Sequence, residues 1–432
     1  MLQVMDYSKE PYRDILCIDV KSFFASVEAV ERRQHPLKAR IAVVSKPDNN
    51  GGLVLASSPL VKQLYGIKTG TRVYEIPRDA AIEIVEPRMA LYLEKNLEII
   101  SIFKQFVAEE DLHVYSIDES FLDVTHSHSL FGSTQAIASQ IQALIWDQLH
   151  LVVTVGIGDN PLLAKLALDH DAKHKQESNF IADWHYKDVQ KTVWKISPMK
   201  DFWGIGPKTE KHLQRMGIRS IFELSQHDVR LLKKKFGVIG EQLFFHSHGI
   251  DRTLLSESFT PKETSFSKNQ ILNRDYTDKH EVEIVIREMA EENAMRLRKH
   301  HYTTSLVKLS IGYSRDVIDG GFSHQLMIEK TDSSKKIIEG LLILFNRHYK
   351  PVPVRVVNVT FGKIEPKSAL QLSLFESAES LILQEDLDQT IDLIRRKYGY
   401  TSLLHASSLA NGGMARQRAK LLGGHRSGKD ER

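Results

Sequence analysis

The sequence predicts an α+β protein of several domains. At 432 residues and 49.3 kDa, the chain exceeds what one hydrophobic core usually organises, so two to four domains are expected. Its 42% hydrophobic and 26% charged residues are typical of a globular protein. Between residues 264 and 362, strand-like and helix-like apolar patterns follow one another in the order β-α-β-β-α-β. This order predicts a split βαβ sheet with helices on one face and an open second face.

A buried central strand is expected at residues 15–18, which are almost wholly apolar. Asp19 stands at the end of this strand, where a carboxylate can be held rigidly and still reach solvent. A helix is expected to begin near Ser22. The single cysteine, Cys17, lies within the strand, where a free thiol packs as a small hydrophobic group.

A second acidic stretch occupies residues 115–123. Apolar residues on both sides of Asp118 and Glu119 predict two short strands that meet at a turn carrying this pair. Neighbouring side chains of a regular strand point to opposite faces, so only a bend lets both carboxylates serve one site. Two carboxylates a few ångströms apart raise each other's pKa unless a cation neutralises them, which suggests a divalent-metal site. An exposed acidic turn is the alternative.

Together the two stretches resemble the Y-family DNA polymerases, the translesion enzymes that include the UmuC branch of bacteria. In that family a strand-end Asp, followed by a Phe-Phe/Tyr-Ala-Ser-x-Glu segment, accompanies a Ser-x-Asp-Glu hairpin. Here these motifs occupy residues 19–28 and 116–119. The resemblance covers residues 14–375. It implies a right-hand polymerase with a palm, small fingers, a helix-hairpin-helix thumb and a β-α-β-β-α-β little finger.

The resemblance also implies the catalytic residues. Asp19, Asp118 and Glu119 would hold two Mg²⁺ ions, with the carbonyl of Val20 as a further ligand. One ion would activate the primer 3′-hydroxyl, and the other would neutralise the triphosphate and the leaving pyrophosphate. The implied reaction is error-prone, template-directed addition of deoxynucleotides across damaged bases.

Four residues are implied to bind the incoming nucleotide: Phe23, Phe24, Lys62 and Lys173. Phe24 falls at the steric-gate position, where an aromatic ring blocks a ribose 2′-hydroxyl, and Phe23 would pack beside the sugar. Core packing is the alternative for Phe24. Lys21 departs from the Asp or Asn that is frequent at its position in the family.

The two lysines come from separate elements. Residues 36–79 resemble the small fingers, whose helix usually offers a Tyr and an Arg to the triphosphate; here the register offers Lys62. A strand and a helix are expected over residues 151–167, with Pro161 in the first turn of the helix. The family's triphosphate lysine then corresponds to Lys173, with Asp171 as one extra residue in the spacing.

The second half of the chain is expected to hold DNA. Residues 1–195 contain 21 Lys and Arg against 26 Asp and Glu, an acidic excess. Residues 196–432 contain 37 Lys and Arg against 29 Asp and Glu, a basic excess. The turn at residues 204–206 resembles a helix-hairpin-helix, whose exposed N–H groups can bind a phosphate without reading sequence. The expected DNA contacts, each of which could instead be a surface charge or a turn residue, are Gly204, Gly206, Lys208, Lys268, Arg274, Lys308 and Arg315.

Residues 371–375, Gln-Leu-Ser-Leu-Phe, match the bacterial sliding-clamp-binding motif. In that motif Gln371 and the pair Leu374 and Phe375 would enter pockets on the clamp, and a core strand is the alternative. We expect a helix over residues 384–398. The polar, Gly-rich residues 407–432 are expected to be mobile.

These expectations divide the chain into a palm (1–35 and 80–195), fingers (36–79), a thumb (196–257), a little finger (258–365) and a tail (366–432). The expected partners are primer–template DNA, deoxynucleoside triphosphates and the sliding clamp, for a monomeric protein. One cysteine excludes an intramolecular disulfide, and no apolar run is long enough to span a membrane, so a cytoplasmic protein is expected.

Two other functions remain open. A nucleotide cyclase has a palm-like sheet that also uses acidic residues and two metals, but it would not explain a helix-hairpin-helix. A non-catalytic DNA-binding scaffold of the same fold is the second alternative, and the retention of all three carboxylates argues against it.

Overall fold

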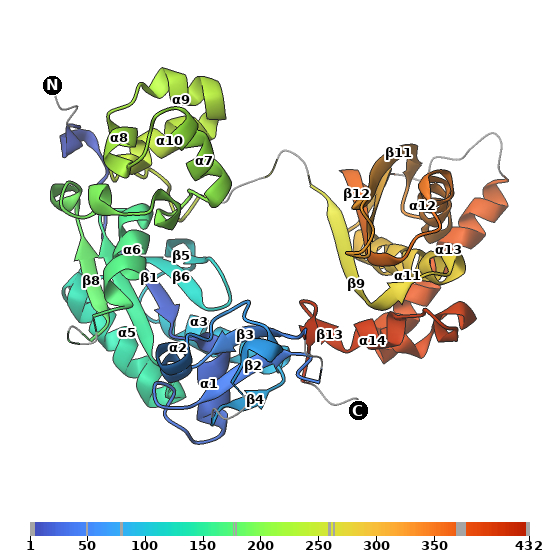
Figure 1. Ribbon diagram of the computed structural model, residues 1–432, viewed down its shortest axis with the longest axis horizontal. Coiled ribbons are helices and arrows are strands. Elements are labelled where there is room, and N and C mark those ends of the chain that lie inside the picture. Colours follow the sequence, from blue (N-terminus) through green and yellow to red (C-terminus); the bar gives the residue numbers. More distant parts are fainter. Residues whose placement is uncertain are drawn as a thin grey trace. The chain divides into compact units, whose positions relative to one another are not determined.

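The computed structural model describes residues 5–428, apart from residues 49–50, 78–80, 176, 178, 258–260, 262–263 and 369–376. The chain forms two compact units, one comprising Met1–Ser258 with His425–Arg432 and the other Phe259–Gly424 (Figure 1). In the described part of the chain, we find no helix with the length and apolarity needed to cross a lipid bilayer.

A five-stranded sheet in the order β5-β6-β1-β7-β8 is the centre of the first unit. Its strands are β1 (Ile15–Val20), β5 (Leu112–Val114), β6 (Glu119–Asp123), β7 (Val153–Gly158) and β8 (Ile181–Trp184). The central strand predicted at residues 15–18 is confirmed: β1 is buried and pairs antiparallel with both β6 and β7.

Helices cover both faces of this sheet. On one face Leu16 and Ile18 share a core with α3 (Met89–Phe103) and α5 (Thr134–Leu149). On the other face Ile15 and Cys17 pack with α6 (Pro161–Ala167). The alternation of strand side chains therefore divides one apolar run between two cores. Two further helices of this part are α1 (Phe23–Glu31) and α4 (His128–Phe131).

The acidic turn differs from its prediction in one respect. β5 ends at Val114 and β6 begins at Glu119, so Asp118 lies in the turn whereas Glu119 is the first residue of a strand. The N–H groups of Tyr115 and Ser116 both donate to the carbonyl of Glu119, at 3.0 and 2.9 Å. This closure withdraws Tyr115 from the ladder and bends the chain between the two carboxylates.

A three-stranded sheet in the order β3-β2-β4 forms a separate layer of the first unit. It contains β2 (Ile41–Ser45), β3 (Leu53–Ser57) and β4 (Glu83–Val85), accompanied by α2 (Pro59–Tyr65). β4 lies beyond the predicted range of 36–79 and pairs parallel with β2. A three-residue strand is too short to show a periodic pattern, so the sequence did not indicate it.

Four helices follow the boundary expected near residue 197: α7 (Pro207–Arg215), α8 (Ile221–Ser225), α9 (Val229–Phe236) and α10 (Val238–Ser247). The predicted turn and helix at residues 204–215 are confirmed. Gly204 has a φ of +94°, which side chains rarely adopt, and Gly206 caps α7 ahead of Pro207 in its first turn.

The second unit is a four-stranded antiparallel sheet in the order β11-β10-β12-β9. Its elements are β9 (Phe266–Tyr276), α11 (Lys279–Lys299), β10 (Tyr302–Tyr313), β11 (Gly321–Thr331), α12 (Ser334–His348) and β12 (Val354–Pro366). The predicted β-α-β-β-α-β order is confirmed, and both helices pack on the same face of the sheet (Figure 1).

Residues 407–432 were expected to be mobile, and the structure corrects this expectation for residues 407–428. After α13 (Ala378–Tyr398), Met414 is buried in the core of the second unit, and Arg418 of α14 (Ala415–Ala419) makes ion pairs with Glu288 and Glu292. A few buried side chains are therefore enough to order a polar, Gly-rich stretch. The last strands are β13 (Leu421–Leu422) and β14 (His425–Arg426).

Candidate active site

Asp19 and Glu119 are direct cross-strand partners in the antiparallel pair of β1 and β6. Directly opposed residues have Cβ atoms about 4.5–5.5 Å apart on the same face of a sheet. Two carboxylates predicted from separate stretches of sequence are therefore brought together by strand register.

Asp118 joins this pair through the turn. The N–H of Val20 donates to the carbonyl of Asp118 at 2.9 Å, which ties the turn to the end of β1. The hydroxyl of Ser116 donates to the Asp118 carboxylate at 2.6 Å. The three predicted carboxylates and the main chain of Val20 thus lie at one end of the central strands.

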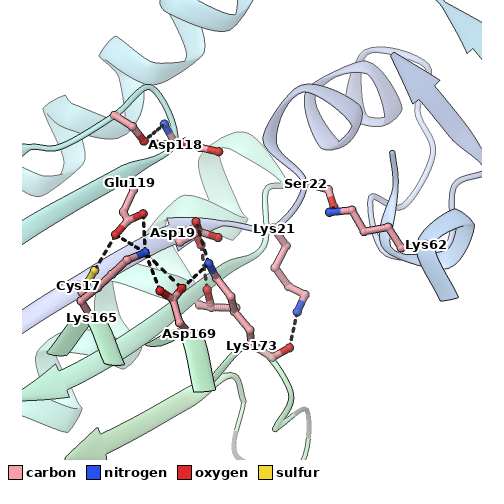
Figure 2. A network of polar contacts seen from close by, with 12 residues as sticks. Cys17, Asp19, Lys21, Ser22, Lys62, Asp118, Glu119, Lys165, Asp169 and Lys173 are labelled. Carbon is pink, nitrogen blue, oxygen red and sulfur yellow. Dashed lines mark hydrogen bonds and ion pairs between the residues drawn. The ribbon is translucent and has the colours of Figure 1, made fainter. Parts of the chain in front are cut away.

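Two lysines approach these carboxylates from the helix side (Figure 2). Nζ of Lys165 is 2.8 Å from Glu119, and Nζ of Lys173 is 3.3 Å from Asp19. Asp169 contacts both ammonium groups, at 3.2 Å from Lys165 and 2.9 Å from Lys173. The result is a continuous network of alternating charges that links the two facing strands to one helical segment.

Two glycines of β7 let α6 approach closely enough to bring Lys165 into this network. A Cβ atom on Gly156 would lie 2.0 Å from the carbonyl oxygen of Ala164, and one on Gly158 would lie 2.3 Å from the N atom of Ala164. Any side chain at either position would push the helix away. α6 is wholly buried, so Lys165 is a charged residue in an otherwise apolar helix.

A π-type turn, Leu168–Ala172, follows α6 and contains Asp171, the extra residue noted in the sequence. The N–H of Lys173 donates to the carbonyl of Leu168 at 3.1 Å, a spacing of five residues instead of four. A π-type turn takes up one additional residue within a helix. Lys173 therefore reaches the carboxylates despite the longer spacing.

Burial dominates the electrostatics of Asp19. It raises the pKa of Asp19 to about 6, Lys173 opposes the rise, and Asp118 and Glu119 add to it. Burial disfavours the charged form of Lys165, but Asp169, Cys17 and Glu119 outweigh this effect, so the pKa of Lys165 is raised.

Cys17 also touches the site, because its Sγ lies 3.2 Å from Oε1 of Glu119 and donates a hydrogen bond to it. Burial, followed by the neighbouring Glu119 charge, raises the pKa of the Cys17 thiol well above its usual value. The thiol is thus kept protonated, which agrees with the packing role expected from the sequence.

A cavity of about 1110 Å³ opens beside the carboxylates. Asp19, Asp118 and Phe24 line one part of it, and Lys62 and Lys173 also face it. Nζ of Lys62 donates to the hydroxyl of Ser22 at 2.9 Å, which brings α2 to the start of α1 (Figure 2). The predicted nucleotide-binding lysines therefore lie on the same cavity as the carboxylates.

The Phe24 ring is stacked on Tyr92 of α3, with the ring centroids 4.5 Å apart and the planes inclined by 15°. The Tyr92 hydroxyl donates to the buried Glu28 at 2.8 Å, and Arg88 makes an ion pair with the same carboxylate. Phe23 is only 2% exposed and packs in the core, and it also lines the cavity beside Phe24.

The chemistry of the carboxylates fits divalent cations, although the described residues contain no group of three His, Cys, Asp or Glu side chains already gathered around a point. Glu119 and Asp19 are turned towards lysines, and Asp118 towards Ser116. Their oxygens are hard donors of the kind Mg²⁺ prefers, and because burial raises the pKa of Asp19, a bound cation would favour its ionised form.

Sequence reasoning missed Lys165 and Asp169. The available signal was a lysine within the apolar run at residues 162–167, since a charge in a buried helix needs a partner. A second signal was spacing: Lys165, Asp169 and Lys173 follow one another at four-residue intervals, which places alternating charges on one helix face.

The predicted DNA contacts are scattered through the chain. Gly204 and Gly206 form the turn before α7, and Lys208 is exposed in the first turn of that helix. Arg274 is paired with Glu281. Arg315 is exposed just beyond β10.

Lys268 and Lys308 lie on opposite faces of the sheet of the second unit. Lys308 pairs with Thr360 and shares the face that α11 and α12 leave uncovered. Lys268 is opposite Val359, a core residue, and makes an ion pair with Glu292 of α11. This corrects the expectation for Lys268, since strand alternation turns it towards the helices.

The clamp motif, with Gln371, Leu374 and Phe375, lies outside the described residues.

Comparison with known proteins shows the family and the fold of this chain. Residues 18–169 match the model of the impB/mucB/samB family, and residues 263–374 match that of its C-terminal domain. A Bacillus subtilis protein named for UV-damage repair, UvrX, is 44% identical to this chain. The alignment covers 98% of this chain and all of UvrX. DNA polymerase IV 2 of the same organism is 34% identical, with 95% of this chain and 98% of that protein covered.

A solved Y-family DNA polymerase chimera superposes with a TM-score of 0.64 at 19% sequence identity, covering 82% of this chain and all of that one. The fold is therefore that of a right-hand polymerase with palm, fingers, thumb and little finger. Together with the relatives named DNA polymerase IV, the family assignment makes the protein a DNA-directed DNA polymerase. The chain belongs to the impB/mucB/samB family of Y-family DNA polymerases.

Proposed function

We propose that this polymerase copies damaged template bases with low fidelity, using two Mg²⁺ ions held by Asp19, Asp118, Glu119 and the carbonyl of Val20. The observation that carries the proposal is the cross-strand pair of Asp19 and Glu119 beside a cavity that also presents lysines. When bound, the ions would activate the primer 3′-hydroxyl and neutralise the triphosphate and pyrophosphate.

The lysines around the site have separate tasks in this proposal. Lys62 and Lys173 bind the triphosphate from two sides of the cavity, since they come from α2 and from the turn after α6. Lys165 is nearly buried and holds Glu119, so it keeps one carboxylate oriented instead of meeting the nucleotide. Asp169 holds both Lys165 and Lys173 in place.

Selection against ribonucleotides rests on Phe24. Its ring lines the cavity and is fixed by the stack with Tyr92, so it occupies the volume that a 2′-hydroxyl would need. Phe23, which also lines the cavity, packs beside the sugar in this proposal and supports Phe24, with their ring centroids 5.8 Å apart.

Binding of primer–template DNA is assigned to the thumb and the little finger. The turn at Gly204 and Gly206 with Lys208 would take a backbone phosphate, and Lys308 and Arg315 would take others. The open face around Lys308 carries mostly small polar side chains, such as Ser310 and Asn358, which suits contact with a sugar–phosphate backbone of any sequence.

The proposed domain limits are the ones expected from the sequence, with two extensions that the fold supports. The fingers, 36–79, gain the strand at Glu83–Val85, and the little finger, 258–365, continues through α13 and α14. The palm comprises the rest of 1–195, and the thumb 196–257. We further propose a monomeric, cytoplasmic enzyme that takes part in the damage response and is tethered to the sliding clamp by residues 371–375.

Primer extension with magnesium tests the proposal on two templates that differ only by an abasic site. We expect incorporation opposite the abasic site and continued synthesis beyond it, with frequent misinsertion on the undamaged template. Omission of Mg²⁺ should abolish both reactions. Accurate synthesis that stops at the abasic site would contradict the translesion assignment, whereas the family assignment would stand.

A further inference from the structure

Lys21 lies in the turn between β1 and α1, two residues after Asp19. Its main chain is held on both sides. The N–H donates to the carbonyl of Val152 at 3.0 Å, and the carbonyl accepts a hydrogen bond from the hydroxyl of Ser26. The side chain therefore extends from a fixed point next to the site.

The ammonium group of Lys21 contacts two residues, Lys173 and Phe180. Its Nζ is 3.0 Å from the main-chain carbonyl oxygen of Lys173 (Figure 2) and 4.2 Å from the centroid of the Phe180 ring. Asn179 and Phe180 have φ values of 55° and 60°, a conformation that costs energy for a bulky side chain such as Phe. An ammonium over the ring face helps to stabilise that conformation.

The contact with Lys173 caps the end of a helical segment. Carbonyl groups in the last turn of a helix have no partner within the helix, and they form the negative end of its dipole. Lys173 follows directly after the π-type turn Leu168–Ala172, so its carbonyl is such a group. The ammonium of Lys21 supplies both the missing donor and a positive charge.

Asp19 and Lys21 hold different parts of Lys173. Asp19 contacts its ammonium group at 3.3 Å, and Lys21 contacts its main chain at 3.0 Å. The first contact uses a carboxylate that is also a proposed metal ligand, so metal and lysine compete for it. The second contact involves no metal ligand and is independent of that competition.

We propose that Lys21 is a positioning residue that holds the main chain of Lys173, and thereby presents the Lys173 ammonium to the triphosphate of the incoming nucleotide. This inference rests on the proposed function, in which Lys173 binds the triphosphate. It assigns a task to the position where this chain has a lysine in place of the family's Asp or Asn.

Single-nucleotide incorporation by two variants tests the inference. Lys21→Met keeps an unbranched side chain but removes the donor, whereas Lys21→Arg keeps donors and charge. We expect Lys21→Met to raise KM for the deoxynucleotide about tenfold with kcat changed less than about threefold, because a misplaced binding group weakens nucleotide binding first. Lys21→Arg should restore most of the loss. An unchanged KM for Lys21→Met would overturn the inference.

A double-mutant cycle with Lys173→Ala separates positioning from a direct contact. If Lys21 acts through Lys173, then Lys21→Met should cause no further rise in KM once Lys173 is Ala. If the double variant instead showed the product of the two single-variant increases in KM, Lys21 would contact the nucleotide itself, and the inference would be wrong.

Lys38→Met is the matched control, since Lys38 is an exposed lysine on the same cavity. We expect its KM to stay within about twofold of the parent; a rise equal to that of Lys21→Met would point to a general loss of charge and overturn the inference. A parent protein that extends no primer would refute the proposed function. An active parent with a Lys21→Met variant of normal KM would refute only the role of Lys21.

Discussion

Asp19 and Glu119 face each other across the antiparallel strands β1 and β6, one hundred residues apart in the chain. Each is held by a different lysine, Asp19 by Lys173 and Glu119 by Lys165. We therefore expect mutations of Glu119 and of Asp19 to have different effects, because Lys165 is nearly buried whereas Lys173 faces the cavity.

The first prediction concerns Asp118→Ala and Glu119→Ala, which should both abolish primer extension. Glu119→Ala should also lower the free energy of unfolding by about 2–3 kcal/mol, because it leaves the buried Lys165 with Asp169 in place of two carboxylates. Asp118→Ala should cost less than about 1 kcal/mol, since its side chain contacts Ser116 within its own turn. Urea unfolding measures the difference.

DNA binding serves as the control for this pair. The basic second half of the chain is expected to hold the duplex, so both variants should bind primer–template with an affinity close to that of the parent. Extension by either variant at more than a few per cent of the parent rate would remove that carboxylate from the mechanism.

The second prediction follows from the raised pKa of Asp19, about 6 in place of 3.8. The folded, metal-free protein holds this proton more tightly than the unfolded chain, so ionised Asp19 destabilises the fold above pH 6. This cost falls as the pH drops from 6 towards 4. Asp19→Asn should therefore raise the melting temperature above pH 7 by a few degrees and remove this part of the pH dependence.

Metal binding should show the same pKa. Because Mg²⁺ needs the ionised carboxylate, the Mg²⁺ concentration that half-saturates the parent should rise about tenfold for each pH unit below 6. Thermal melting at several Mg²⁺ concentrations between pH 5 and 8 measures this directly. A half-saturation that does not change with pH would contradict both the pKa and the assignment of Asp19 as a ligand.

The third prediction is that Phe24→Ala admits ribonucleotides, because it removes the stacked ring that we propose fills the 2′ volume. Phe23→Ala is the matched comparison. Phe23 is buried, so its removal should cost about 3–5 kcal/mol of stability with a smaller change in sugar preference. The ratio of kcat/KM for deoxy- and ribonucleotides measures the gate, and a folded Phe24→Ala protein with the parent ratio would reject it.

The fourth prediction is that replacing Gln371, Leu374 and Phe375 by Ala removes stimulation by a loaded sliding clamp but leaves short, clamp-free extension unchanged. A tether raises the effective concentration of enzyme at the primer end without altering the chemistry. Leu374 and Phe375 should supply most of the binding energy, since buried apolar anchors usually dominate such contacts. Loss of clamp-free activity in the triple variant would place the segment in the core.

The sequence predicted those elements whose pattern is long or strongly periodic. The apolar run of β1 and the β-α-β-β-α-β order of the second unit are of this kind. β4 has only three residues and gave no such pattern. The ordered C-terminal part gave none either, because Met414 and Arg418 are isolated buried residues in a polar stretch.

The sequence predicted the acidic residues of the site and the cavity lysines Lys62 and Lys173, but not Lys165. Asp19 and Asp118 stand beside apolar runs that signal strands, so their neighbourhood could be argued from local pattern. Lys165 reaches Glu119 only because Gly156 and Gly158 let a helix approach, a contact between distant residues. Lys268 was assigned to the wrong face because the register that places it opposite Val359 is not visible in the sequence.

The chain returns to the first unit at its C-terminal segment, and this has a consequence for protein engineering. Residues 425–428 belong to the first unit, where the N–H of Ala90 donates to the carbonyl of Ser427 at 2.9 Å and Arg426 pairs with Glu86. In chain topology the little finger is therefore an insertion with two covalent connections. An exchange of this domain between relatives requires two junctions, near residues 258 and 424, and a single-junction fusion would place one parent's terminal segment against the other parent's α3.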